Sequence, residues 1–118
     1  MTTALLVAVA GAGGVLIRYG LGTLVAGAGA LWMTLAINVS GSFALGVLLA
    51  AGWSTDGARS AIGVGFLGGF TTYSTFSVQT VMAADSGRWL LAGSYLGASV
   101  VLGILAAVAG VALGRSLR

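Results

Sequence analysis

The residues best suited to chemistry in this sequence are uncharged hydrogen-bond donors spaced four apart inside apolar segments. Thr34, Asn38 and Ser42 follow one another at this spacing, and Tyr95 and Ser99 repeat it further along the chain. Residues four apart lie on one face of a helix, so each set forms a polar stripe. All five side chains can donate a hydrogen bond. Donors without a nearby carboxylate favour a small anion as the bound group.

Two aromatic residues extend this set of donors. Tyr73 and Phe76 are three residues apart, so they lie on one side of the helix that carries them. The edges of their rings carry partial positive charge. A bare small anion loses on the order of tens of kcal/mol of hydration in a dry medium. A pathway through such a medium has to supply donors along its whole length.

These rings follow a stretch that makes a poor membrane helix. Between Gly65 and Ser77, three glycines and five Ser or Thr residues interrupt an apolar segment, and the chain has no proline. A break here must come from the glycines and from hydroxyls that bond to the backbone. In lipid, freed backbone groups are tolerated only where protein or a hydrated cavity satisfies them. We therefore predict a membrane helix broken at mid-depth, which is typical of an ion or substrate site.

The composition places these features in a bilayer. Of the 118 residues, 58% are hydrophobic and 6% are charged, which lies outside the range of soluble domains. We expect one all-α integral membrane domain over residues 1–118, with spans at about 4–25, 31–53, 60–84 and 89–113. Each span exceeds the roughly 20 residues that cross a bilayer. Short turns or loops are expected at 26–30, 54–59 and 85–88.

Several function classes are excluded by the residues that are missing. The sequence has no His, Cys, Lys or Glu, so disulfides, thiol nucleophiles and ordinary zinc sites are excluded. No residue inside the spans can act as an acid or base near neutral pH, so we do not expect an enzyme. The net charge of +3 comes from a few residues at segment ends, which does not indicate a nucleic-acid surface. The first apolar run lacks a preceding basic residue and is interpreted as a retained helix rather than a signal peptide.

The oligomeric state and the orientation depend on weaker patterns. Four spans place both termini on one side, and the excess of arginines on that side is too small to determine orientation. Glycines recur four apart at Gly93 and Gly97 and at Gly110 and Gly114, which permits close helix packing within one subunit or between subunits. Four short helices make a thin bundle, so we expect a pore to form between copies.

Asn38 and Arg18 each have two interpretations. A buried amide needs a partner, and for Asn38 this is either another helix or a ligand. Arg18 lies about two thirds of the way through the first span. It either extends to the lipid headgroups or lines a hydrated vestibule that concentrates anions.

At three places the sequence resembles the CrcB/Fluc family of small bacterial fluoride channels. The matching motifs are GGVLIRY at residues 13–19, TLAINVSGSF at 34–43 and, most strongly, GFLGGFTTYSTF at 65–76. Their order and depth in a four-span chain are specific. The resemblance implies passive export of fluoride across the cytoplasmic membrane, which protects the cell from fluoride. It also implies an antiparallel homodimer with dual topology and two pores, in which a second copy of the chain and the lipid bilayer are the partners.

The resemblance also implies roles for individual residues. Asn38 would contact fluoride, and Tyr73 and Phe76 would present their ring edges to it. The backbone carbonyls of Gly68 and Thr71 would hold a central structural sodium ion. Further candidates for the anion pathway are Tyr95 and Ser99 and, more weakly, Thr34, Ser74 and Thr75.

Two residues depart from the family pattern. Tyr73 stands where the family usually has Phe, and Gly103 stands where a third hydroxyl is expected. Some relatives pair two different chains, so a heterodimer with a paralogue is an alternative to the homodimer.

A small multidrug exporter would need a carboxylate inside the membrane, but Asp56 and Asp85 fall in expected loops. A membrane assembly subunit without transport is the remaining alternative.

Overall fold

The protein is helical throughout the part that the structure describes. The structure is a computed structural model, and it describes residues 2–52 and 54–118. Its elements are α1 (Thr3–Gly22), α2 (Ala28–Ala51), α3 (Asp56–Arg59), η1 (Ser60–Leu67), α4 (Gly68–Phe70), α5 (Tyr73–Asp85) and α6 (Trp89–Ser116). Neither of the two described ranges contains a β-strand. The predicted all-α class is confirmed.

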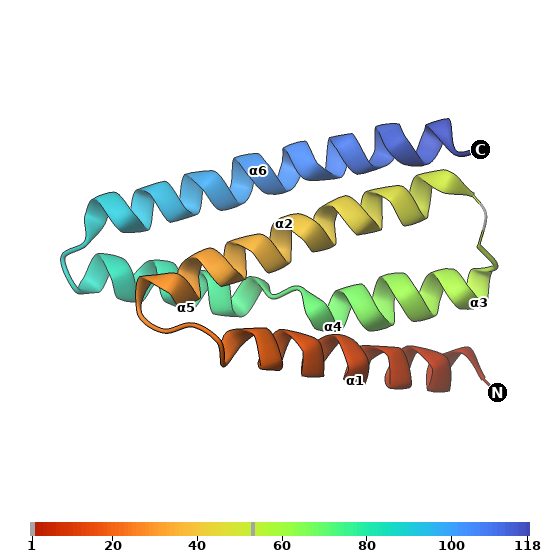
Figure 1. The fold of residues 1–118 in the computed structure, drawn as a ribbon, viewed down its shortest axis with the longest axis horizontal. Helices are drawn as coiled ribbons and strands as arrows, with labels where there is room; N and C mark the ends of the chain where they lie inside the picture. The colour runs from red at the N-terminus through yellow and green to blue at the C-terminus, as the bar shows by residue number, and fades with distance from the viewer. Residues whose placement is uncertain (1, 53) are drawn as a thin grey trace.

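The helices form four long segments that run side by side (Figure 1). Three of them, α1, α2 and α6, are long and apolar enough to cross a membrane. The remaining segment consists of two parts separated by a break (Figure 1). The first part is a rod made of α3, η1 and α4, and the second part is α5. The chain begins and ends at the same end of the bundle (Figure 1). These features make it a multi-pass membrane protein, and the crossing of the broken segment stays a prediction.

The helix ends differ from the predicted spans by a few residues. α1 ends at Gly22, before the expected limit at residue 25, and α2 starts at Ala28. The turn between them lies earlier than predicted, because Gly27 takes a positive φ of 57° that glycine tolerates. The predicted end of the second span, Trp53, lies outside the described residues. α6 continues to Ser116, past residue 113.

The predicted loop at 54–59 is wrong over most of its length. Asp56–Arg59 forms the first turn of the third segment. Thr55 caps this turn, since its Oγ1 accepts a hydrogen bond of 3.2 Å from the Ala58 N–H. Asp56 in this first turn also suits the positive end of the helix dipole. The two charges of this region therefore begin a helix, and the prediction failed because the capping signal was read as a polar loop.

Glycines bring α2 and α6 into backbone contact. A Cβ atom on Gly110 would collide with the carbonyl of Phe43, and one on Gly114 would lie 2.7 Å from the carbonyl oxygen of Val47. The Gly110 and Gly114 pair therefore packs within one chain. A Cβ on Gly93 or Gly97 would meet nothing within 4 Å among the described residues. A contact between subunits at that second pair stays a prediction.

Two glycines of the third segment, Gly65 and Gly69, pack against α1. A Cβ on Gly65 would lie 2.6 Å from the Val7 carbonyl oxygen, and one on Gly69 would lie 2.5 Å from the Gly11 carbonyl oxygen. Gly65 lies within η1, and Gly68 and Gly69 belong to α4. The chain stays helical through these three glycines and breaks after them, so the prediction that they break the helix is wrong. Gly65 and Gly69 instead let the backbones of α1 and the third segment approach closely, whereas a Cβ on Gly68 would meet the Gly63 carbonyl oxygen at 3.8 Å.

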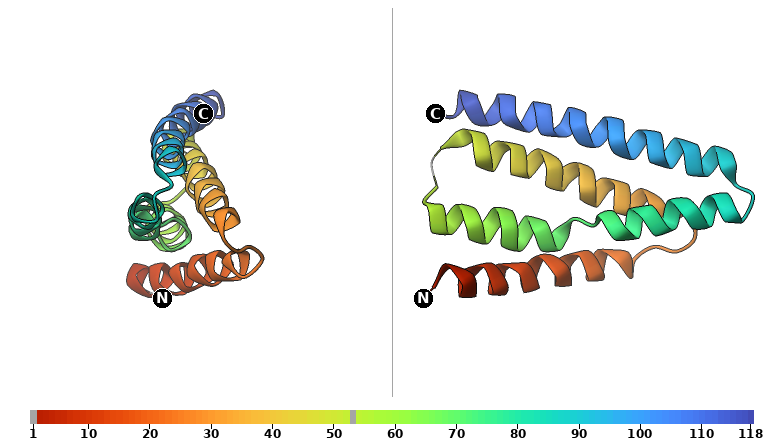
Figure 2. Two further views of the ribbon diagram at one scale, coloured as in Figure 1. Left: turned by 90° about the vertical axis from the view of Figure 1, so that its left-hand side faces the viewer. Right: turned by 180° about the vertical axis from the view of Figure 1, so that it is seen from behind.

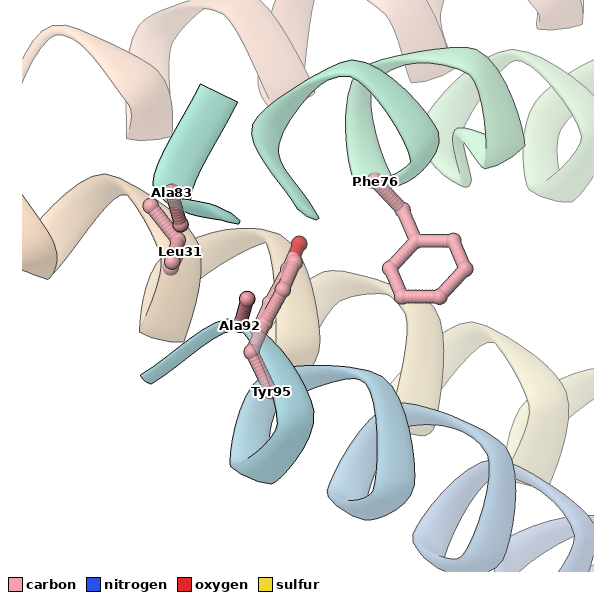
Figure 3. Close-up of a cluster of buried hydrophobic side chains, with 5 residues drawn as sticks. All are labelled: Leu31, Phe76, Ala83, Ala92 and Tyr95. Atoms are coloured by element: carbon pink, nitrogen blue, oxygen red, sulfur yellow. The ribbon is translucent and has the colours of Figure 1, made fainter. Parts of the chain in front are cut away.

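The bundle is thin, as predicted. Its extents are 48 × 30 × 19 Å, and the shortest is less than two helix diameters of about 10–12 Å each. Figure 2 shows α1 along one side of the broken segment and α2 and α6 on the other. The main cluster of buried side chains, which joins α2, α5 and α6, consists of Leu31, Phe76, Ala83, Ala92 and Tyr95 (Figure 3).

Candidate functional site

The third segment breaks at Thr71 and Thr72, which take extended conformations between α4 and α5. In an unbroken helix the Thr72 N–H would donate to the Gly68 carbonyl. Here it donates to Oδ1 of Asn38 at 2.8 Å, and Nδ2 of Asn38 donates to the Thr72 carbonyl at 2.9 Å. One amide side chain from α2 therefore pairs both backbone groups of Thr72. The break lies within the predicted stretch, and the residue that pairs its freed backbone groups is 34 positions away.

Three more hydrogen bonds pair backbone groups next to the break. Thr72 caps α5, because its Oγ1 accepts from the Thr75 N–H at 3.3 Å. The Thr71 hydroxyl donates back to the Leu67 carbonyl at 2.9 Å. Arg18 reaches across from α1, and its Nε donates to the Gly69 carbonyl at 3.1 Å. The sequence predicted that hydroxyls bond to the backbone at the break. The contacts of the Thr71 and Thr72 hydroxyls agree with this prediction.

The break removes the donors that a continuous helix would supply to the carbonyls of residues 68–71, and Gly68 and Thr71 are the two of these that were predicted to bind sodium. The Thr72 N–H goes to Asn38 instead of the Gly68 carbonyl, and the Thr75 N–H goes to Thr72 Oγ1 instead of the Thr71 carbonyl. Neutral carbonyl oxygens at the end of a half-helix suit a hard cation such as sodium. The residues predicted to hold sodium therefore fit it. The described residues hold no cluster of His, Cys, Asp or Glu that could bind a metal in another way.

A groove of about 510 Å³ opens beside the break, between α2, the broken segment and α6. It brings together four predicted pathway residues, Asn38, Tyr73, Phe76 and Ser99, with Gly68 and Thr71. Its further lining includes Gly41 and Ser42 from α2 and Val100, Gly103 and Ile104 from α6. Asn38 and Ser42 from α2 and Ser99 from α6 thus line one groove, whereas Thr34 and Tyr95 of the same two stripes do not line it.

The two aromatic residues lie together, at different depths. The ring centroids of Tyr73 and Phe76 are 5.9 Å apart, with the planes tilted by 57°. Tyr73 is 80% exposed at the rim, and Phe76 is 9% exposed. Phe76 extends from α5 toward α2 and α6 (Figure 3), and its centroid lies 5.4 Å from that of Tyr95. The predicted pairing on one side of the helix is confirmed.

Ser99 supplies the free donor of the groove. Its Oγ is buried and has no hydrogen-bond partner among the described residues. Ser42, on the opposite wall, instead donates to the Asn38 carbonyl at 2.8 Å. Buried hydroxyls are usually paired. An unpaired one in a groove is therefore a position where a ligand or water can be bound.

A second cavity, of about 370 Å³, lies on the other side of the break. Arg18, Thr34, Thr72, Thr75 and Gln79 are among its lining residues. Thr34 also donates to the Ala30 carbonyl at 3.0 Å. The polar stripe of α2 therefore serves two cavities, with Thr34 in this one and Asn38 in the groove. Arg18 lines the cavity and bonds to the break, so its side chain is directed toward the broken segment.

Two predicted residues line neither cavity. Ser74 is exposed on α5. Tyr95 is completely buried, and its hydroxyl, which is directed toward α5 in Figure 3, donates to Oε1 of Gln79 at 2.7 Å. Tyr95 also meets Trp32 edge to face, with centroids 6.3 Å apart. Gln79 was missed by the sequence analysis, although it is the only glutamine of the chain and follows Phe76 by three residues.

Comparison with known proteins identifies the family. Residues 5–111 match the family described as CrcB-like protein, Camphor Resistance (CrcB). A protein of Novosphingobium aromaticivorans named fluoride-specific ion channel FluC is 39% identical, over 99% of both chains. Proteins of the same name from Thermus thermophilus and Rhizobium leguminosarum are each 44% identical, over 96% and 99% of this chain and 95% and 99% of the relatives. The chain therefore belongs to the CrcB-like family, as its three motifs predicted.

Proposed function

We propose that this protein is a passive, fluoride-selective channel that exports fluoride across the cytoplasmic membrane and so limits fluoride toxicity. The observation that carries the proposal is the groove at the helix break, where Asn38, Phe76 and Ser99 meet. The names of the relatives, fluoride-specific ion channels, support it.

The chemistry of the groove suits a small dehydrated anion. Asn38 uses one N–H on Thr72, and its second N–H is available to an ion. The Ser99 hydroxyl is unpaired among the described residues, and Phe76 adds the positive edge of its ring. These groups are neutral donors, so they replace hydration without forming a deep electrostatic trap.

The second cavity is the proposed vestibule of this pathway. Arg18 lines it together with the hydroxyl groups of Thr34 and Thr75. Its positive charge raises the local concentration of anions at the entrance. The break, with Thr72 lining both cavities, separates the vestibule from the groove.

We also propose a central structural sodium ion in an antiparallel homodimer. The carbonyls of Gly68 and Thr71 from two copies would hold it, because both lack their helical donors. Bound there, sodium would neutralise the negative ends of two half-helices that face each other. A thin bundle with a laterally open groove supports a pore completed by a second chain.

A partner of different sequence is the alternative to the homodimer. Beyond Ser99, the α6 side of the groove is lined by Val100, Gly103, Ile104 and Ala107, which carry no side-chain donor. Tyr73 places a hydroxyl at the rim, where the family usually has Phe. A paralogue that carries hydroxyls along its own α6 would supply donors to the other pore.

The other function classes have less support. A proton-coupled exporter needs a carboxylate within the membrane, and the two acids lie in the first turn of α3 and at the end of α5. An assembly subunit without transport would not need an unpaired hydroxyl in an open groove.

Fluoride efflux from liposomes tests the proposal. Purified protein in vesicles loaded with potassium fluoride should release fluoride after valinomycin is added, and vesicles loaded with chloride should retain their anion. Fluoride retention at the level of protein-free vesicles, by protein that elutes as a defined species, would contradict it.

A further inference from the structure

Arg18 lines the second cavity, and it also makes a hydrogen bond that its proposed role of attracting anions does not require. Its Nε donates at 3.1 Å to the carbonyl of Gly69, a residue 51 positions away in α4. In a continuous helix this carbonyl would accept the N–H of Tyr73, but Tyr73 is the first residue of α5, beyond the break. The guanidinium therefore takes the place of a lost backbone donor.

The packing of α1 against α4 sets the position of this bond. A Cβ on Gly69 would lie 2.5 Å from the Gly11 carbonyl oxygen, and a Cβ on Gly14 would collide with the Phe66 carbonyl. The two backbones are thus in direct contact over about one turn. Arg18 is seven residues after Gly11 and four after Gly14, so it lies on the same face of α1. The side chain reaches Gly69 because glycines hold the two helices together.

We propose that Arg18 is a positioning residue that holds the end of α4, in addition to attracting anions. Its Nε occupies the Gly69 carbonyl, as Asn38 occupies both backbone groups of Thr72 from the other side. Among the described residues, the carbonyls of Gly68, Phe70 and Thr71 have no donor that replaces the lost helical one. This inference rests on the proposed function, since Gly68 and Thr71 are the proposed sodium ligands. Arg18 thereby keeps the Gly69 carbonyl from facing the cation.

The covalent structure of the side chain allows the two roles to be separated. In Gln the amide nitrogen occupies the same place along the chain as Nε of Arg, so Arg18→Gln keeps a donor there and removes the charge. In Lys a methylene stands at that place and the ammonium lies one bond further, so Arg18→Lys keeps the charge and moves the donor. Arg18→Met removes both. Arg115→Gln is the matched control for loss of one charge, because Arg115 is exposed near the end of α6.

The test combines amide hydrogen exchange with fluoride efflux. Exchange is followed by mass spectrometry in lipid nanodiscs on peptides covering residues 68–76, with peptides of α6 as an internal measure of global folding. Removing a hydrogen bond to a charged donor should speed exchange at the break by about tenfold. We expect this in Arg18→Lys and Arg18→Met, with Arg18→Gln and Arg115→Gln close to the unmodified protein.

Fluoride efflux then distinguishes the positioning role of Arg18 from its attraction of anions. Arg18→Lys should lower fluoride efflux about equally at low and high ionic strength, because the charge is kept and the break is loosened. Arg18→Gln should lower it mainly at low ionic strength, where a surface charge acts at longest range. Wild-type exchange and wild-type efflux in Arg18→Lys would overturn the inference, and so would equally fast exchange in Arg18→Gln and Arg18→Lys.

The inference and the proposed function fail in different ways. If the unmodified protein carries no fluoride, the channel proposal is wrong, and the order of exchange rates among the variants still tests the role of Arg18. If fluoride passes but all variants exchange alike at the break, the positioning role is wrong and the channel proposal stands.

Discussion

Asn38 and Thr72 are joined by two hydrogen bonds, of 2.9 and 2.8 Å, between α2 and the break in the third segment. One amide thereby replaces both partners that Thr72 loses when the helix stops. The interpretation of Asn38 as a contact between helices is confirmed by this geometry. Its contact with fluoride stays a prediction, which uses the N–H that Thr72 leaves free.

Removing the Asn38 amide should loosen the break. Asn38→Ala leaves the N–H and C=O of Thr72 without side-chain partners, which should cost about 2 kcal/mol of stability. Asn38→Asp keeps the acceptor, loses the donor and adds a negative charge to the groove, so it should reduce fluoride efflux further than its loss of stability explains. Thermal unfolding and liposome efflux measure the two effects.

Ser40→Ala is the matched control on α2. Ser40 is exposed, and its hydroxyl bonds only to the Ile37 carbonyl of its own helix, at 3.1 Å. Its substitution should change neither measurement. Equal stability in Asn38→Ala and Ser40→Ala would show that the amide does not hold the break.

Ser99→Ala should separate function from stability. The Ser99 hydroxyl is buried and unpaired among the described residues, so its removal should leave stability unchanged or slightly raised. Efflux should fall by about tenfold, because one donor to the dehydrated ion is lost. Ser116→Ala, near the end of α6, is the control. A stability loss above about 1 kcal/mol would indicate that the hydroxyl has a structural partner in the assembly.

Replacing the ring of Phe76 should reduce transport. Phe76→Leu keeps an apolar side chain of similar bulk and removes the positive ring edge, so we expect efflux to fall by at least about tenfold, the effect of about 1.4 kcal/mol. Phe43→Leu makes the same change at an α2 side chain that is 38% exposed and outside the groove. If both variants conduct alike, the ring edge of Phe76 is not part of the pathway.

The two glycine pairs of α6 should respond differently to an added methyl group. Gly110→Ala puts a Cβ into the Phe43 carbonyl, and such overpacking typically costs about 1–3 kcal/mol. Gly97→Ala meets nothing within 4 Å and should be neutral or slightly stabilising, because alanine favours helix. Thermal unfolding and the oligomeric state in detergent measure the outcome. Dissociation of the assembly in Gly97→Ala would place a subunit contact at that pair.

Sodium removal should destabilise the assembly. The carbonyls of Gly68 and Thr71 lack their helical donors, and in the proposed homodimer without a cation they would face one another with partial negative charges. Exchanging sodium for N-methyl-D-glucamine should lower the thermal midpoint and slow fluoride efflux, and returning sodium should restore both. An unchanged midpoint and efflux rate would contradict the proposed sodium site.

The sequence by itself determined the helices and the faces that they present. Lipid requires each spanning segment to pair its own backbone, so runs of more than 20 apolar residues could only be helices. Four-residue spacing then predicted that Asn38 and Ser42 share one face of α2, and both line the groove. The density of hydroxyls between Gly65 and Ser77 also located the broken stretch correctly.

Only the tertiary structure decided where the helix stops and what holds it. At the break, both backbone groups of Thr72 bond to Asn38, which is 34 residues away, and no local pattern predicts such a partner. The same applies to Arg18, whose acceptor is 51 residues distant. A glycine can either loosen its own helix or allow a neighbouring backbone to pack closely. Only the position of α1 showed that Gly65 and Gly69 allow close packing. Hydrogen bonds and close contacts between segments depend on the relative placement of the helices, which hydrophobic periodicity does not encode.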